Sequence, residues 1–249
     1  MLARTVEELL GPDREQRRVR AVVAPHAGYV YSGRIAGEVY SKIRVPDLCV
    51  VLCPNHTGAG VQRSLDRDET WRTPLGDVPV DAALADALLG RAGLARDIRA
   101  HAREHALEVH LPFIQARNPG ARIVPICLGR VPPDGCVEIG EVLAEVVSRA
   151  GEDVLLVAST DMSHYIPARD AAVLDRMALD RVEALDAIGL YRTVAEHDIS
   201  MCGVIPTTTV LAAARALGAT AAELVRYGHS GETSGDLEHV VGYAGLVIQ

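Results

Sequence analysis

Short apolar runs alternate with amphipathic segments along most of the chain. The runs have the length of β-strands and occur at residues 19–24, 48–52, 123–128, 154–158 and 244–248. Patterns with helical periodicity lie around them, at residues 34–43, 82–90, 105–117, 137–150, 171–187 and 207–217. Strands that are apolar on both faces and are separated by helices are typical of a mostly parallel sheet covered on both sides. The pattern therefore predicts an α/β protein with three layers, α/β/α.

Two segments depart from this alternation. Residues 69–80 contain a Thr-Pro-Leu-Gly-Asp sequence and are typical of a β-hairpin or of an excursion from the sheet. The last two apolar runs, 224–227 and 240–247, are joined by a Gly- and Ser-rich turn and predict an antiparallel pair at the edge of the mixed sheet. The chain has no internal repeat, low-complexity tract or linker, so we expect residues 1–249 to form a single domain.

Composition and charge narrow the class of protein. Of the 249 residues, 49% are hydrophobic and 23% are charged, a balance that can bury a full core. The net charge of −8 provides no basic field for a nucleic acid. No apolar run approaches the roughly 20 residues of a membrane span, and the first ten residues lack the apolar core of a signal peptide. We therefore expect a cytoplasmic protein that binds neither nucleic acid nor membranes.

Residues with metal-binding or catalytic capacity follow three of the predicted strands. His26 comes after the first strand, His56 after the second, and Asp161 and His164 after the fourth. Because ligands of open α/β sheets bind beyond the carboxyl ends of the strands, we expect these side chains to share one crevice. Neutral imidazoles that converge in a crevice are a common basis for a transition-metal site. Asp161 could orient such ligands or act as a ligand itself.

Cysteine usage indicates one chemically active thiol. The five cysteines are odd in number and include no C-x-x-C pair, so neither a disulfide framework nor a structural zinc site is expected. Cys202 precedes a helical pattern, and we expect the positive end of the helix dipole to lower its pKa, as a metal ligand or nucleophile requires. The remaining cysteines are interpreted as structural: Cys49, Cys53, Cys127 and Cys136.

The segment around Glu104 holds further candidates. His101 and His105 are four residues apart, a spacing that would put both imidazoles on one face of a helix. Glu104 precedes His105, so the order of residues excludes the H-E-x-x-H motif of zinc proteases. Glu104 is interpreted either as a helix-capping residue or as an acid or base of the pocket.

The scarce aromatic residues indicate a pocket wall. Aromatic residues make up only 4% of the chain, yet Tyr29, Tyr31 and Tyr165 lie beside the candidate ligands. We expect Tyr29 and Tyr165, together with Glu104 and His105, to line the substrate pocket. The glycines near Tyr29 form neither a G-x-G-x-x-G fingerprint nor a P-loop, so nucleotide binding is not predicted.

Six motifs, in order along the chain, make this sequence similar to the Memo family, which in prokaryotes includes the AmmeMemoRadiSam system protein B. The motifs are APHAGYVYSG (24–33), PNHTG (54–58), WRTPLG (71–76), EHALEVHLPF (104–113), STDMSHY (159–165) and MCG (201–203) with Pro206 after it. The resemblance implies the fold of the class III extradiol ring-cleavage dioxygenases, which are non-haem Fe(II) enzymes.

The resemblance also implies roles for individual residues. It puts His26, His56 and Cys202 at the metal, which would be Fe(II), and Asp161 and His164 beside it. His164 would match the pocket histidine that acts as acid and base in the dioxygenases. Those enzymes hold iron by two histidines and one carboxylate, however, whereas the third ligand here would be a thiolate. A thiolate is softer and can be oxidised by O₂, so ring cleavage is in question, and copper or zinc are the alternatives to iron.

The start of the chain is a second departure from the family. Members of the family usually carry a P-A-V-A-G-x-F-Y-P-like motif before the first helix, whereas this chain starts in what is interpreted as that helix. The resemblance therefore implies either a truncated start or a branch of the family without the segment.

Three functional hypotheses follow. The leading one is a metal-dependent, oxidoreductase-like protein with dioxygenase-type chemistry at a His/His/Cys site. The alternative is a non-enzymatic module that uses the pocket to bind a small aromatic molecule, a peptide or a partner protein, and the resemblance implies Ammecr1-like and radical-SAM proteins as partners. The third is hydrolysis, with zinc-activated water or Cys202 as nucleophile and His164 as base.

Overall fold

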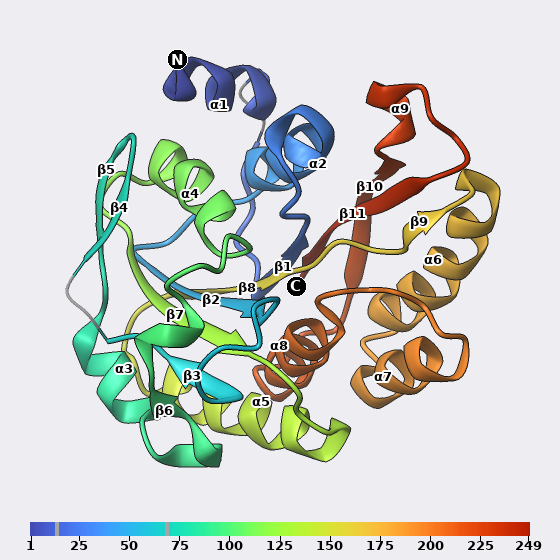
Figure 1. Ribbon diagram of the computed structural model, residues 1–249. Coiled ribbons are helices and arrows are strands. Elements are labelled where there is room, and N and C mark those ends of the chain that lie inside the picture. Colours follow the sequence, from blue (N-terminus) through green and yellow to red (C-terminus); the bar gives the residue numbers. More distant parts are fainter. Residues whose placement is uncertain (13–14, 68–69) are drawn as a thin grey trace.

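A computed structural model describes residues 1–12, 15–67 and 70–249 (Figure 1). The α-helices are α1 (Leu2–Leu10), α2 (Tyr29–Lys42), α3 (Ala82–Leu88), α4 (Leu111–Arg117), α5 (Pro133–Ser148), α6 (Ala168–Glu183), α7 (Ala187–Glu196), α8 (Val204–Ala216) and α9 (Gly231–Ser234). The 3-10 turns are η1 (Arg91–Gly93), η2 (Ile98–Ala100) and η3 (Glu108–His110). The strands are β1 (Ala21–Ala24), β2 (Leu48–Pro54), β3 (Arg63–Leu65), β4 (Thr70–Thr73), β5 (Gly76–Pro79), β6 (Ala95–Arg96), β7 (Arg122–Leu128), β8 (Val154–Ser159), β9 (His164–Ile166), β10 (Ala222–His229) and β11 (Val240–Ile248).

The main sheet is mixed, with a parallel centre. Its strands follow the order β10-β11-β1-β8-β2-β7-β3-β6, and β9 pairs with the start of β11. The four central strands β1, β8, β2 and β7 run parallel to one another. At one edge, β10 and β11 pair antiparallel with each other, and β11 pairs antiparallel with β1. The predicted mostly parallel sheet and its antiparallel C-terminal edge pair are confirmed.

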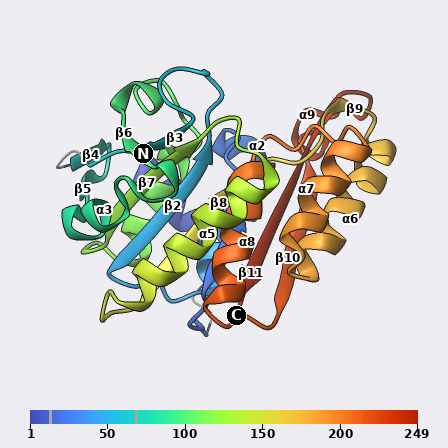
Figure 2. The same cartoon turned by 90° about the horizontal axis from the view of Figure 1, so that it is seen from below.

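Helices cover both faces of this sheet. Side chains of β2 alternate between two cores: Val50 and Leu52 pack with α3, α5, α6, α7 and α8, whereas Val51 and Cys53 pack with α1, α2 and α4. Figure 1 shows the second group of helices above the sheet, and Figure 2, seen from below, shows α5 to α8 crossing the other face. Because both faces are buried, the central strands are apolar except at Arg122, which begins β7, and Ser159, which ends β8, and this is the pattern that predicted three layers.

The predicted helix at residues 105–117 is wrong in its first part. His105 has no regular structure, residues 106–107 form a turn, η3 follows, and α4 begins only at Leu111. Pro112 stands in the first turn of α4, where its missing N–H costs nothing, so this position favours a helix start. Upstream, the carboxylate of Glu104 accepts a hydrogen bond from the backbone N–H of Ala106 at 3.0 Å, which stabilises a turn instead of a helix.

The smaller elements lie at the edge of the main sheet. The predicted hairpin is present as the antiparallel pair β4 and β5, while Glu69, the first residue of the predicted range, lies outside the described residues. The short strands β3 and β6 extend the sheet beyond β7 and were not predicted. In the described part of the chain, no helix is both long and apolar enough to cross a membrane.

Candidate metal centre

Three neighbouring parallel strands deliver the candidate residues to one edge of the sheet. His26 follows β1, His56 follows β2, and Asp161 and His164 follow β8, which lies between the other two. Because the three strands are parallel, their carboxyl ends meet at the same edge. The candidate residues therefore lie together beyond the ends of β1, β8 and β2.

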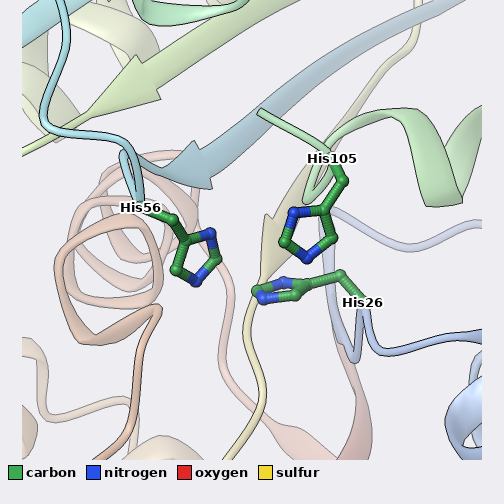
Figure 3. A group of neighbouring side chains, drawn as sticks. All are labelled: His26, His56 and His105. Atoms are coloured by element: carbon green, nitrogen blue, oxygen red, sulfur yellow. The ribbon is translucent and has the colours of Figure 1, made fainter. Parts of the chain in front are cut away.

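Three imidazole rings converge there. One ring nitrogen each from His26, His56 and His105 lies within 4.8 Å of the other two. The ring centroids of His26 and His56 are 5.2 Å apart, and the rings of His56 and His105 stack with an interplanar angle of 17°. Figure 3 shows the rings around a common space, each from a different loop. His105, which was predicted as a pocket residue, thus lies with the two histidines that were predicted to bind metal.

The buried carboxylate of Glu104 organises two of these histidines. It accepts hydrogen bonds from the backbone N–H of His56 at 2.6 Å and from Nδ1 of the same residue at 2.8 Å. Its Oε1 atom also lies 3.6 Å from Nδ1 of His105. Burial alone would raise the pKa of Glu104, but the hydrogen bonds from His56 and Ala106 outweigh it and lower the pKa. The hydrogen bond to Glu104 in turn raises the pKa of His56, against the effect of burial.

His26 is the most deeply buried of the three histidines. It is 2% exposed, and burial, together with the neighbouring histidines, holds its pKa well below 6.5. Its Nδ1 atom lies 2.7 Å from the hydroxyl of Ser159, and its Nε2 atom lies 3.3 Å from Sγ of Cys202. His26 is therefore neutral at physiological pH, which is the state in which imidazole binds metals.

Cys202 lies beside His26, but its pKa is not lowered. Burial, reinforced by the charge of Asp161, raises the pKa of the thiol to about 12. The expected lowering by the dipole of α8 is therefore wrong for the metal-free protein, because loss of water outweighs a dipole that acts only on the first turn. Sγ accepts a hydrogen bond from the backbone N–H of Asp161 at 3.2 Å. The other four cysteines are buried, in line with a structural role.

Asp161 and His164 flank the three histidines. Oδ1 of Asp161 accepts a hydrogen bond from the backbone N–H of His26 at 2.8 Å, and burial raises the pKa of this carboxyl despite that bond. His164 is held by Ser200, whose carbonyl oxygen lies 2.8 Å from Nδ1 and whose hydroxyl accepts from the backbone N–H. The Nδ1 proton of His164 is thereby committed, which leaves Nε2 available for a ligand.

The tyrosines differ in how far they are available to a ligand. The hydroxyl of Tyr29 donates to the carbonyl oxygen of Val109 at 2.7 Å, and its ring packs on Phe113. Tyr31 and Tyr165 have exposed fractions of 44% and 74%. Tyr165 also adopts a positive φ of 58°, a conformation that costs free energy in a non-glycine residue.

His101 and His105 do not share a helical face. His101 ends the short turn η2, and residues 102–107 are not helical before η3 begins. The ring of His101 instead packs edge-on against Trp71, with centroids 5.7 Å apart. The i, i+4 spacing was misleading because no helix joins the two residues.

A group behind the histidines escaped prediction. Ser159, His110 and Tyr40 are fully buried and are connected to His26 by hydrogen bonds. Their contacts join residues that lie 49 to 133 positions apart in sequence, so no local pattern could indicate them. The only signal was a polar residue, Ser159, at the end of an otherwise apolar strand.

A solved structure supports the architecture. An uncharacterized protein from Escherichia coli K12 superposes with a TM-score of 0.60, covering 91% of this chain and 99% of that one. At 16% sequence identity, this likeness concerns the fold alone.

Sequence comparisons concern the family of this chain. A family model described as Memo-like protein matches residues 1–247. A MEMO1 family protein of Methanothermobacter thermautotrophicus is 41% identical over 234 residues, which cover 92% of this chain and 84% of that protein. A MEMO1 family protein of Methanosarcina barkeri is 42% identical over 240 residues, with 96% and 90% covered. One of Aquifex aeolicus is 40% identical over 237 residues, with 94% and 88% covered. Since both the family model and these relatives span nearly the whole sequence, the chain belongs to the Memo family.

Proposed function

We propose that this protein binds one transition-metal ion at the edge of the sheet beyond β1, β8 and β2 and acts as an oxidoreductase-like protein. The observation that carries the proposal is the group of three imidazole nitrogen atoms, from His26, His56 and His105, within 4.8 Å of one another. Imidazole suits iron, copper and zinc. Fe(II) is the ion we favour, with copper and zinc as the alternatives.

The donor atoms fit such an ion. Nδ1 of His56 is committed to Glu104 and Nδ1 of His26 to Ser159, which leaves the Nε2 atom of each ring available to a metal. A carboxylate behind a histidine ligand fixes its orientation and raises its basicity. Two side chains compete for the third position. His105 completes the group by distance, and Cys202 offers a sulfur atom 3.3 Å from Nε2 of His26.

The remaining residues provide orientation and proton transfer. A bound iron or copper ion would supply redox chemistry, and a zinc ion would supply Lewis-acid chemistry. Asp161 holds the backbone of His26 in place through its Oδ1 atom. His164 has its Nδ1 proton donated to the carbonyl of Ser200, so its Nε2 atom can take up or release a proton at a substrate.

Metal reconstitution under anaerobic conditions tests this proposal. We expect the protein to take up one equivalent of Fe(II), and His56→Ala to lose most of that capacity. His197→Ala is the matched control, because His197 is an exposed histidine at the end of α7. If the protein takes up no iron, copper or zinc, or if both variants lose metal equally, the proposed site is wrong.

Cobalt substitution decides the third ligand. Co(II) bound to a thiolate has a charge-transfer absorption that Co(II) bound only to histidines lacks. If Cys202 is a ligand, Cys202→Ser abolishes that band and His105→Ala preserves it. If His105 is the ligand instead, the wild-type protein lacks the band and His105→Ala lowers the affinity for cobalt.

An exposed aromatic rim favours a second candidate function, binding without turnover. Tyr31 and Tyr165 are exposed, and both lie close enough to Tyr243 to contribute to its raised pKa, which burial mainly causes. Such a rim suits a small aromatic molecule or an aromatic side chain of a peptide. Oxygen consumption by the iron-loaded protein with a panel of catechols would support the enzyme. Binding of a catechol without consumption, weakened by Tyr165→Ala, would support the binding module.

A further inference from the structure

A buried hydroxyl group stands behind the histidine group. The Oγ atom of Ser159 lies 2.6 Å from the carbonyl oxygen of Ala106, 2.7 Å from Nδ1 of His26 and 2.9 Å from Nε2 of His110. Ser159 and His110 are fully buried and His26 is 2% exposed, so these polar atoms must satisfy one another. Three partners are also the most that a hydroxyl group can serve, since it has one proton and two lone pairs.

The hydroxyl proton of Ser159 can be donated to only one of the three partners. Two buried oxygen atoms 2.6 Å apart need a proton between them, and a carbonyl group has none to give. Ser159 therefore donates to Ala106. Its two lone pairs remain, and each must receive a proton from an imidazole ring. This count puts a proton on Nδ1 of His26 and a proton on Nε2 of His110.

The next residue in the chain of hydrogen bonds agrees with this count. Burial lowers the pKa of His110 to about 3, so the ring is neutral and carries only one proton. With that proton on Nε2, its Nδ1 atom is an acceptor, and the hydroxyl of Tyr40 lies 3.2 Å away to donate to it. The four side chains thus form one closed set in which each donor has an acceptor.

We propose that Ser159 is a positioning residue that sets the tautomer of His26, so that the Nε2 lone pair of His26 points into the group formed with His56 and His105. This role rests on the metal-binding function proposed above. Because a neutral imidazole has only one proton, a proton fixed on Nδ1 leaves Nε2 free to bind. Ser159 also holds the carbonyl of Ala106, the residue after His105, and so ties two of the three histidines to the end of β8.

The two side chains that accept a hydrogen bond from the ligand histidines, Glu104 and Ser159, are chemically different. His56 donates its Nδ1 proton to the carboxylate of Glu104, whereas His26 donates to a neutral hydroxyl. A charged acceptor makes the imidazole more basic than a neutral one does. The site therefore pairs a strongly donating ligand, His56, with a more weakly donating one, His26.

The tautomers can be measured in the metal-free wild-type protein. Long-range ¹H–¹⁵N spectra of the imidazole rings distinguish a proton on Nδ1 from one on Nε2. We expect His26 to carry its proton on Nδ1 and His110 on Nε2. A proton on Nε2 of His26, or on Nδ1 of His110, would overturn the proposal. This measurement requires neither a variant nor a bound metal, so it stands even if the protein binds no ion and the proposed function fails.

Variants then test the consequence for metal binding. Ser159→Ala removes the acceptor for both rings, and we expect the affinity for Fe(II), measured by competition with a chelator, to fall about 10- to 100-fold. Ser159→Thr keeps a hydroxyl group and should restore most of the affinity and the wild-type tautomers. Ser64→Ala is the matched control, because Ser64 is another buried serine that donates to a backbone carbonyl, that of Asp97, away from the histidines.

The outcomes separate positioning from a general effect on the fold. A folded Ser159→Ala protein with wild-type affinity and wild-type tautomers contradicts the proposal, as does an equal loss of affinity in Ser64→Ala. If Ser159→Ala does not fold, the wild-type spectra and the Ser159→Thr variant decide the question.

Discussion

At the scale of single residues, Glu104 is the charge around which the site is built. Its carboxylate is buried, yet its pKa is lowered, because the N–H groups of His56 and Ala106 surround it. One side chain thereby fixes both the loop after β2 and the turn that carries His105. The alternative role considered for Glu104, a helix cap, does not apply, because no helix begins beside it.

Glu104→Gln tests this arrangement. The amide keeps the shape of the side chain but removes the charge, so His56 becomes less basic and its orientation less fixed. We expect the affinity for Fe(II) to fall about 10- to 100-fold, as measured by chelator competition. Glu108→Gln, an exposed acid in the same segment, should bind iron like the wild type. Unchanged affinity in Glu104→Gln would show that the carboxylate does not support the ligands.

The place of a site residue could be predicted only where the local sequence pattern indicates it. His26, His56 and Asp161 follow apolar strands, and parallel strands bring such positions together whatever the rest of the sequence is. The position of His105 could not be predicted, because its spacing of four residues from His101 indicated a helix that the structure does not have. Ser159 acts through contacts 49 to 133 residues distant, so its role required the tertiary structure.

At the scale of elements, α6 anchors the loop that bears Asp161 and His164. Asp175, in the middle of α6, is fully buried and accepts hydrogen bonds from the N–H and hydroxyl groups of Ser163 and from the hydroxyl of Tyr227. The helix thus joins the end of β8 to β10 through one carboxylate.

Asp175→Ala should destabilise the protein strongly. The substitution leaves the two buried donors of Ser163 and the half-buried hydroxyl of Tyr227 without an acceptor, and we expect a loss of about 3 kcal/mol in the free energy of unfolding. Urea denaturation measures it. Asp180→Ala, which removes an exposed ion pair with Arg176 from the same helix, should cost about 1 kcal/mol or less. Equal effects of the two substitutions would contradict the anchoring role.

The pH dependence of stability offers a second test of α6. Burial raises the pKa of Asp175 despite its hydrogen bonds, so the folded protein holds this proton more tightly than the unfolded chain does. The resulting stabilisation is present at pH values below the pKa that Asp175 has in the unfolded chain. It is lost as pH rises through the pKa that Asp175 has in the folded protein. As pH rises above about 4, urea midpoints of the wild type should therefore fall relative to those of Asp175→Asn. A constant difference between the two proteins would refute this.

Close packing joins α1 to α2 at Gly37. A Cβ atom at this position would lie 2.2 Å from the backbone oxygen of Leu9, which is not part of a flexible side chain. Gly37→Ala should therefore force α1 away and cost about 1–3 kcal/mol in urea denaturation. Gly120→Ala is the control, because its nearest contact would be an ordinary 3.5 Å. A neutral Gly37→Ala would mean that α1 shifts freely.

At the scale of the whole molecule, the architecture followed from the alternation of strands and helices. Central strands buried on both faces leave a strong apolar signal, so three layers and a parallel centre could be predicted. The order of strands could not, because β3 and β6 have only three and two residues and carry little pattern. The antiparallel edge was predicted from its Gly- and Ser-rich turn.

The C-terminal strand holds that edge together. β11 pairs with β1, β9 and β10. Deletion of residues 240–249 should therefore leave β1 with an open edge and β10 without a partner. We expect an insoluble or unfolded protein, assessed by circular dichroism and gel filtration. A soluble truncated protein with cooperative thermal unfolding would contradict this expectation.

The pairing of β1 with β11 also sets the order of events during synthesis. Val22 of β1 is partnered by Val247, so the strand that leads to His26 stays incomplete until residue 248 has left the ribosome. During that time β1 presents an open apolar edge, which other chains can pair with. Contacts between such distant residues also slow folding. The sheet edge that carries His26 is thus among the last parts of the molecule to form.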